Sequence, residues 1–128
     1  MIVVDTSVWI AASKQPILAR TLDELIEADE VSLALPVRLE LLAGISRSKR
    51  KAFKRQFAAL PQLHPTLETW QQLPQWIEQA ADVGDHFTLS DLLIASMTAE
   101  IGGLVWSLDT DFQRMERLKF VSLYELPH

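Results

Sequence analysis

Four acidic side chains in this sequence have the type and spacing to bind a metal ion: Asp5, Glu40, Asp91 and Asp109. Hard divalent cations such as Mg²⁺ and Mn²⁺ prefer oxygen ligands, which carboxylates supply. An ion held in this way neutralises the negative charge that develops on a phosphodiester and activates water. Because carboxylates repel one another in the absence of a cation, gathering four of them would indicate a functional site.

Each acid also has a purely structural explanation. Asp5 begins an Asp-Thr-Ser turn, whose side chains would satisfy backbone donors at the start of a helix. Asp91 follows Thr88 with the spacing of a capping box. Glu40 would be a solvated helix residue, although its apolar neighbours imply that it needs a partner. Asp109 lies in the sequence Leu-Asp-Thr-Asp, which is also common in turns. Only if the four acids converge in the fold can a metal-binding role be distinguished from these structural roles.

The segments around these acids alternate between strands and helices. Apolar and β-branched runs predict strands at residues 2–4, 31–35, 104–108 and 120–123, with an extended or turn-like segment at 61–65. Helices are predicted over residues 7–12, 16–26, 36–43, 67–83 and 88–99, and a short one precedes the last strand. A basic helix with Phe53, Phe57 and Leu60 as its apolar stripe is predicted after Gly44. This alternation predicts an α/β domain with a mainly parallel central sheet.

The predicted sheet brings the acids toward one edge. Asp5 and Asp109 each follow the carboxyl end of a predicted strand. In open parallel sheets, that edge is where ligand crevices form. Glu40 and Asp91 lie on helices that could lean over the same edge. The sequence therefore predicts where the site lies but does not prove that the four acids meet.

Several residues mark the ends of the predicted helices. Ser7 can cap the first helix through its hydroxyl group. Pro36 suits the first turn of the helix that carries Glu40, because a missing N–H costs nothing there. Gly44 and Gly84 are natural terminators. Pro74 must either kink the helix over residues 67–83 or begin a second helix.

Length and composition predict one globular domain spanning residues 1–128. The chain is 48% hydrophobic and 23% charged, which is ordinary for a folded protein. It has no cysteine, so disulfides and thiolate metal sites are excluded. The N-terminus meets an acid at position 5 and is a poor signal peptide. Apolar runs are too short to span a membrane, so we expect a soluble, cytoplasmic protein without a membrane partner.

The net charge of −5 argues at first sight against a nucleic-acid partner. Six of the twelve Lys and Arg residues, however, fall between Arg47 and Arg55. Four of them are candidates for RNA contact: Arg47, Lys49, Arg50 and Lys51. A basic stretch of this kind can follow an RNA backbone. It can equally be the solvated face of a helix, and the sequence does not decide between the two.

Four motifs in order along the whole chain resemble the PIN-domain family, and in size the chain is similar to its VapC toxin ribonucleases. The motifs are MIVVDTSVW at residues 1–9, LELLAG at 39–44, LSDLLIAS at 89–96 and VWSLDTDF at 105–112. Each contains one of the four acids. The chain departs from the family pattern at Ser107, where Thr is more frequent. It also departs at His86 and Thr88, where an apolar residue and often Pro are expected.

The resemblance implies a three-layer α/β/α fold and cleavage of RNA that depends on Mg²⁺ or Mn²⁺. It also implies a homodimer and a cognate antitoxin protein. It assigns metal binding to three acids: Asp5, Asp91 and Asp109. Glu40 would bind or orient the attacking water. Ser7 and Ser107 would hold carboxylates or phosphate by hydrogen bonds, and Asp111 would be an auxiliary ligand.

Two other functions remain open from the sequence. The first is a PIN-like module that binds RNA or protein and has no catalytic activity; the four intact acids argue against it. The second is a phosphoaspartyl enzyme with Asp5 as its nucleophile. Phosphatases related to haloacid dehalogenases place a second Asp two residues later, whereas this chain has Ser7 there.

Overall fold

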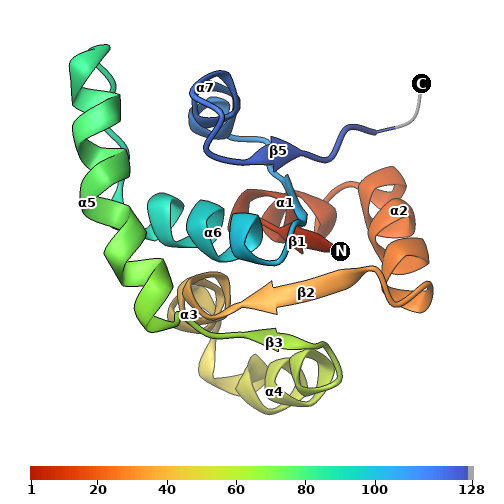
Figure 1. Ribbon diagram of the computed structural model, residues 1–128. Coiled ribbons are helices and arrows are strands. Elements are labelled where there is room, and N and C mark those ends of the chain that lie inside the picture. The colour runs from red at the N-terminus through yellow and green to blue at the C-terminus, as the bar shows by residue number, and fades with distance from the viewer. Residues whose placement is uncertain (127–128) are drawn as a thin grey trace.

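A parallel β-sheet forms the centre of the molecule in the computed structural model, which describes residues 1–126 (Figure 1). Within these residues the strands are β1 (Ile2–Val4), β2 (Val31–Ala34), β3 (Gln62–Leu63), β4 (Leu104–Trp106) and β5 (Ser122–Leu123). The helices are α1 (Thr6–Ala12), α2 (Pro16–Glu27), α3 (Leu35–Gly44), α4 (Arg50–Ala58), α5 (Leu67–Asp82), α6 (Leu89–Glu100) and α7 (Thr110–Arg117), with a 3₁₀ turn at Arg47–Lys49.

The sheet has the strand order β3-β2-β1-β4-β5, and every pair is parallel. β1 is therefore the central strand, and its Val4 is in register with Trp106 of β4. The backbone N–H of Asp5 donates to the Trp106 carbonyl at 2.8 Å, which extends the pairing by one residue. Asp5 and Ser107 consequently leave the sheet side by side at its carboxyl edge. The predicted parallel α/β architecture is confirmed.

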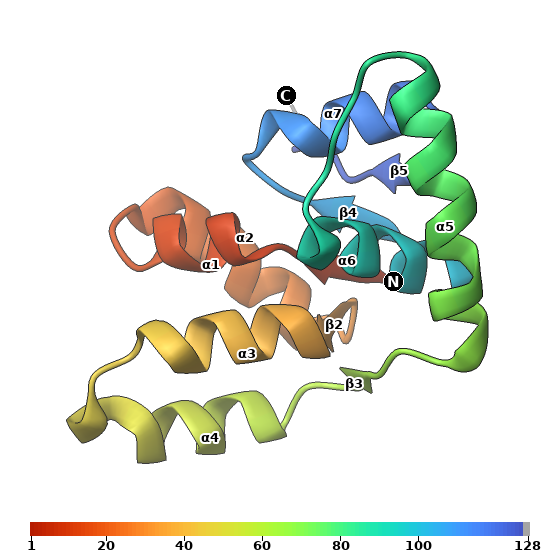
Figure 2. The same cartoon turned by 90° about the vertical axis from the view of Figure 1, so that its left-hand side faces the viewer.

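Helices cover both faces of the sheet, which gives three layers. Along β1, Val3 packs with Leu33 and Val105 in a core shared with α3, α4, α5, α6 and α7. Ile2 and Val4 point the other way, into a smaller core with α1 and α2. Figure 1 shows α3 and α6 on one side of the strands and α2 on the other, and Figure 2 looks onto the face that α3 and α6 cover. All three residues of β1 are buried because both faces are covered.

Three strands are shorter in the structure than the sequence predicts. β2 ends at Ala34 rather than at residue 35, because Leu35 already belongs to the first turn of α3, where Pro36 fits. β4 ends at Trp106 rather than at residue 108, and β5 begins only at Ser122 rather than at residue 120. Residues beyond Trp106 instead hydrogen-bond to side chains of the site described below.

Helix α5 runs without interruption across Pro74. The alternative of a second helix beginning at this proline is therefore wrong. Thr66 caps the start of α5. Its hydroxyl accepts a hydrogen bond from the Thr69 N–H at 3.3 Å, and the two residues form a reciprocal capping box. No helix within residues 1–126 combines the length and the apolar character needed to cross a membrane.

Gly103 provides a test of the close approach between β1 and β4. A Cβ atom at this position would lie 2.8 Å from the Met1 carbonyl oxygen, which accepts the Leu104 N–H at 3.0 Å. Gly103→Ala must displace this backbone, and we expect it to lower the free energy of unfolding by about 1–3 kcal/mol. Chemical denaturation measures the change.

Gly44→Ala is the matched control. Gly44 ends α3, and an added Cβ would meet nothing within 4 Å. Since Ala favours helix over Gly, we expect this variant to be as stable as the wild type or more stable by up to about 1 kcal/mol. Equal denaturation midpoints for the two variants would contradict the steric explanation.

Candidate metal centre

Asp5 is a buried carboxylate held by two serine hydroxyls. Its side chain is only 6% exposed. Ser7 Oγ and Ser107 Oγ both donate to Oδ2 of Asp5 at 2.8 Å, and the two hydroxyl oxygens are 3.2 Å apart. Asp5 occupies the N-cap position of α1 but makes no side-chain capping bond. The interpretation of Asp5 as a turn residue that satisfies backbone donors is therefore wrong, and so is the prediction that Ser7 caps this helix.

The same two serines also accept hydrogen bonds from the loop after β4. The Leu108 N–H donates to Ser7 Oγ at 3.0 Å, and the Asp109 N–H donates to Ser107 Oγ at 2.9 Å. Each hydroxyl thus joins the carboxylate of Asp5 to the backbone that carries Asp109. This network fixes the start of α1 relative to the segment that leads into α7.

Three further carboxylates lie close together at the same edge: Asp91, Asp109 and Asp111 each offer an oxygen within 4.8 Å of the others. They come from the first turns of two helices. Thr88 Oγ1 accepts the Asp91 N–H at 3.2 Å and caps α6, while Asp109 Oδ1 accepts the Asp111 N–H at 2.9 Å and caps α7. Asp109 therefore also has a structural role as the cap of α7, which uses one of its two carboxylate oxygens.

The pKa of Asp91 reflects its burial and the charges of its acidic neighbours. This pKa is raised from an ordinary 3.8 to about 6. Burial is the largest cause, followed by the charges of Asp5 and then Asp109, while a hydrogen bond with the Thr88 side chain acts in the opposite direction. Asp5 is thus close enough to affect the cluster. Crowded oxygen donors of this kind fit a hard divalent cation, whose charge would remove the repulsion.

Glu40 lies at the margin of this cluster rather than inside it. Its carboxylate is exposed, and Oε1 accepts a hydrogen bond from Ser90 Oγ at 2.6 Å. Ser90 directly precedes Asp91, so the contact joins α3 to the start of α6. Glu40 is thus solvated, as one of the two interpretations from the sequence had it, and its neighbour Leu39 is also 53% exposed. The partner that Glu40 was expected to need is nevertheless present.

The most closely spaced acids differ from the predicted metal set in one member. Asp111, expected as an auxiliary ligand, belongs to the group with Asp91 and Asp109, whereas Asp5 adjoins it. Sequence reasoning also missed Arg114, which pairs with Asp111 and, at 3.0 Å, with Asp85. The spacing of three residues between Asp111 and Arg114 on a predicted helix could have indicated the first of these pairs.

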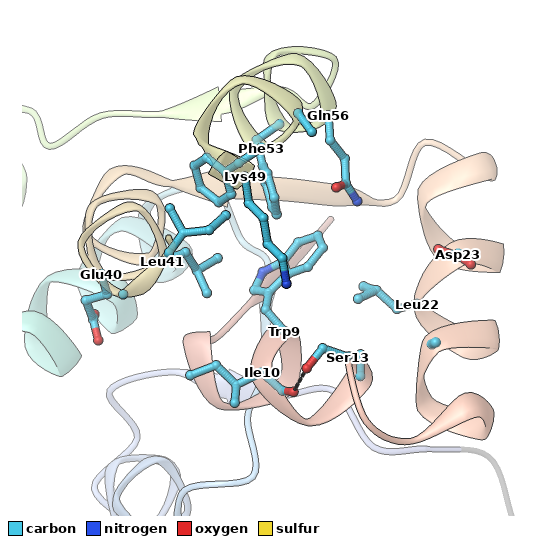
Figure 3. A pocket seen from close by; sticks show the side chains of 16 residues that line it. Trp9, Ile10, Ser13, Leu22, Asp23, Glu40, Leu41, Lys49, Phe53 and Gln56 are labelled. Atoms are coloured by element: carbon cyan, nitrogen blue, oxygen red, sulfur yellow. Dashed lines mark hydrogen bonds between the residues drawn. The ribbon is translucent and has the colours of Figure 1, made fainter. Parts of the chain in front are cut away.

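A pocket of about 580 Å³ lies between α1, α2, α3 and α4 (Figure 3). Its lining is mostly apolar and includes Trp9, Leu41 and Phe53, with Glu40 at one side. Figure 3 shows the Lys49 amino group directed toward Trp9 and the Glu40 carboxylate directed away from it. The neighbouring basic residues of the segment 47–51 are exposed, and their contact with RNA stays a prediction.

Comparison with known proteins identifies the family. The sequence model of the PIN domain matches residues 2–118, which is nearly the whole chain. The chain therefore belongs to the PIN-domain family. A comparison with curated protein sequences found no match.

Solved structures of the same fold come from bacterial VapBC complexes. The VapBC2 structure from Rickettsia felis, bound to a promoter DNA fragment, has a TM-score of 0.80 at 16% identity, covering 99% of this chain and 100% of that chain. VapBC-1 from nontypeable Haemophilus influenzae has a TM-score of 0.77 at 16% identity, covering 98% of each chain. VapBC-5 from Mycobacterium tuberculosis has a TM-score of 0.71 at 23% identity, covering 97% of each chain. At these identities the likeness concerns the fold.

The raised pKa of Asp91 predicts how the stability of the metal-free protein depends on pH. The folded state binds the Asp91 proton more tightly than the unfolded state, so this proton stabilises the fold below about pH 4. That contribution is lost as the pH rises through the folded-state pKa of about 6. We expect Asp91→Asn, measured in EDTA, to raise the melting temperature by a few degrees at pH 7 and to change it much less at pH 4.

Asp82→Asn is the control for this pH series, because Asp82 is an exposed acid at the end of α5. It should show no such difference between the two pH values. Thermal melts followed by circular dichroism measure both variants. A shift for Asp91→Asn that is equal at pH 4 and pH 7 would contradict the electrostatic description of the cluster.

Proposed function

We propose that this protein, as a single PIN domain over residues 1–128, is an endoribonuclease that depends on Mg²⁺ or Mn²⁺ and acts as the toxin of a toxin–antitoxin pair. The observation that carries the proposal is the group of carboxylates at the carboxyl edge of the sheet. Asp91, Asp109 and Asp111 offer oxygens within 4.8 Å of one another. Asp5 raises the pKa of Asp91 and therefore acts on the same group. Membership of the PIN-domain family supports this reading over a phosphoaspartyl enzyme.

The metal would be held by Asp5, Asp91 and Asp109, with Asp111 as a further oxygen donor. A bound Mg²⁺ or Mn²⁺ supplies positive charge that stabilises a phosphodiester during cleavage and makes a water molecule more acidic. Ser7 and Ser107 orient Asp5, because both hydroxyls donate to the same oxygen of its carboxylate. The other oxygen accepts no hydrogen bond from the residues that the structure describes, so it is available to a ligand.

Glu40 is proposed to orient the attacking water. Ser90 donates to Oε1 of Glu40 at 2.6 Å and fixes the direction of the carboxylate. The other oxygen then accepts a hydrogen bond from the water and, as the reaction proceeds, its proton. Because Glu40 is exposed, its carboxylate is accessible to an RNA strand that approaches from solvent. The basic residues Arg47, Lys49, Arg50 and Lys51 are proposed to contact the backbone of that strand.

The partner is proposed to be a cognate antitoxin. The structures that share this fold include VapBC-5, a member of a family of toxin–antitoxin systems, and a toxin–antitoxin complex from Klebsiella pneumoniae. The pocket has the apolar lining that an amphipathic segment requires, and Glu40 lies at one side of it. We propose that such a segment enters the pocket and places an arginine against the carboxylates, because a guanidinium matches carboxylate geometry with two hydrogen bonds. This contact would block access to the metal site.

A homodimer is supported by an apolar stripe on the outer surface of α5. Leu67, Trp70 and Ile77 lie on one side of this helix at spacings of three and seven residues, and each is at least 48% exposed. Exposed apolar side chains that lie together mark protein interfaces. An enzyme that cleaves cellular RNA and is restrained by an antitoxin is proposed to act in the cytoplasm.

The cleavage assay tests the proposed activity directly. We expect the purified protein to cleave RNA with added Mg²⁺ or Mn²⁺ and to lose this activity in EDTA. Asp5→Asn should lower the rate by roughly 100-fold or more, as removal of a single catalytic interaction typically does. It should also reduce the stabilisation that Mn²⁺ gives to the folded protein by mass action. Gel analysis of RNA fragments and thermal melts provide the two measurements.

Asp82→Asn, which removes a distant exposed charge, should leave both measurements unchanged. Cleavage that persists in EDTA would contradict the metal mechanism. RNA binding without cleavage under all metal conditions would instead identify a PIN-like binding module without catalytic activity.

Expression in bacteria tests the partner. Production of the wild-type protein alone should slow growth, and co-production of the protein encoded by the adjacent small gene should restore it. Asp5→Asn should be harmless yet still retain the co-purifying partner. If the wild type neither affects growth nor retains a partner, the toxin assignment fails while the nuclease assignment stands.

A further inference from the structure

We propose that Arg114 is a positioning residue of the metal centre, which holds Asp111 in place by tying the start of α7 to the loop before α6. The inference rests on the proposed function, since it takes Asp91, Asp109 and Asp111 as the group that receives the metal. Arg114 itself lies outside that group. Its role follows from three contacts, one with its own helix α7 and two with the loop before α6.

The first two contacts are ion pairs made by separate nitrogens of one guanidinium. Nη2 of Arg114 donates to Oδ1 of Asp111, one helical turn earlier on α7. Nη1 donates to Oδ1 of Asp85 at 3.0 Å, across 29 positions of the sequence. Because the guanidinium is planar and rigid, fixing one of its nitrogens constrains the direction of the other. Asp85 therefore determines where Arg114 can hold Asp111.

The third contact anchors Arg114 against the core. Its guanidinium carbon lies 5.2 Å from the centre of the Phe87 ring, within the range of a cation–π interaction. Phe87 is buried and meets Phe120 edge-on at 6.5 Å. Phe120 in turn stacks on Trp76 of α5 at 4.5 Å. The side chain of Arg114 thus rests on an aromatic column that belongs to the interior.

These contacts join the two segments that deliver the acids. The loop between α5 and α6 contains Asp85 and Phe87, and Thr88 then caps α6 one turn before Asp91. Arg114 holds this loop at two successive points while it also holds Asp111. The starts of α6 and α7 are consequently fixed relative to each other.

An alternative role for Arg114 would be that of a cation competing with the metal for Asp111. The two roles predict opposite changes, because loss of a competing cation would strengthen metal binding. The structure favours positioning, since the charge of Arg114 is shared between two carboxylates and its ring contact restricts its movement. Within residues 1–126, Arg114 donates to Oδ1 of Asp111 and makes no hydrogen bond to its Oδ2.

Titration of the full-length protein with MnCl₂ by isothermal calorimetry tests the proposal. We expect Arg114→Ala to raise the Kd for Mn²⁺ by about 10-fold, the effect typical of removing a residue that orients a metal ligand. Arg117→Ala is the matched control. Arg117 lies on the same helix, is exposed and makes no ion pair within residues 1–126, so this variant should bind Mn²⁺ as the wild type does.

A double-mutant cycle separates positioning from loss of charge. Asp85→Asn leaves Arg114 and Asp111 intact, yet it should also raise the Kd for Mn²⁺, by a few-fold. Combined with Arg114→Ala, it should add nothing further, because both changes break the same link. Arg114→Lys keeps the charge but not the two-armed geometry, and it should recover only part of the affinity. Circular dichroism in EDTA reports whether each variant is folded.

The outcomes are distinguishable. A wild type that does not bind Mn²⁺ would overturn the proposed function, and this inference with it. A wild type that binds while Arg114→Ala binds equally well or more tightly would overturn the positioning role alone. If Arg114→Ala does not fold, Asp85→Asn decides: an unchanged Kd for Mn²⁺ in this variant would overturn the role of the link.

Discussion

Repulsion between carboxylates at one edge of a parallel sheet is the constraint around which this molecule is arranged. Asp5, Asp91, Asp109 and Asp111 are like-charged groups, and the pKa of Asp91 is raised by its burial first and then by the charges of the other three. Such a group persists only if its members are fixed by other contacts. These contacts are the hydrogen bonds from the serine hydroxyls to Asp5, the caps of α6 and α7, and the ion pairs of Arg114. Most of the polar contacts near the edge serve this purpose.

The supporting contacts differ in kind on the two sides of the cluster. Toward β1 they are neutral hydroxyl hydrogen bonds, which orient Asp5 without neutralising it. Toward α7 they include a guanidinium that offsets part of the charge of Asp111. Among residues 1–126, Asp5, Asp91 and Asp109 form no ion pair. A cation drawn to the site would therefore meet the charge of these three carboxylates.

The sequence predicts features that depend on local pattern and fails where distant packing decides. The buried run 2–4 indicates a strand covered on both faces, and the parallel order of strands brings Asp5 and Asp109 to one edge. Glu40 was expected in an apolar environment, but the exposure of Leu39 depends on what covers α3 in three dimensions. The link between Arg114 and Asp85 was likewise out of reach, because it depends on the position of Phe87 against Phe120.

The register between β1 and β4 also governs when the site can exist during synthesis. Val4 pairs with Trp106, so the central strand finds one of its two neighbours about a hundred positions later in the chain. A chain that leaves the ribosome N-terminus first presents Asp5 long before Ser107, Asp109 or Asp111 has been made. Closing such a long loop is also slow compared with forming local helices. The acid group therefore cannot assemble until the chain has been made at least as far as Asp111.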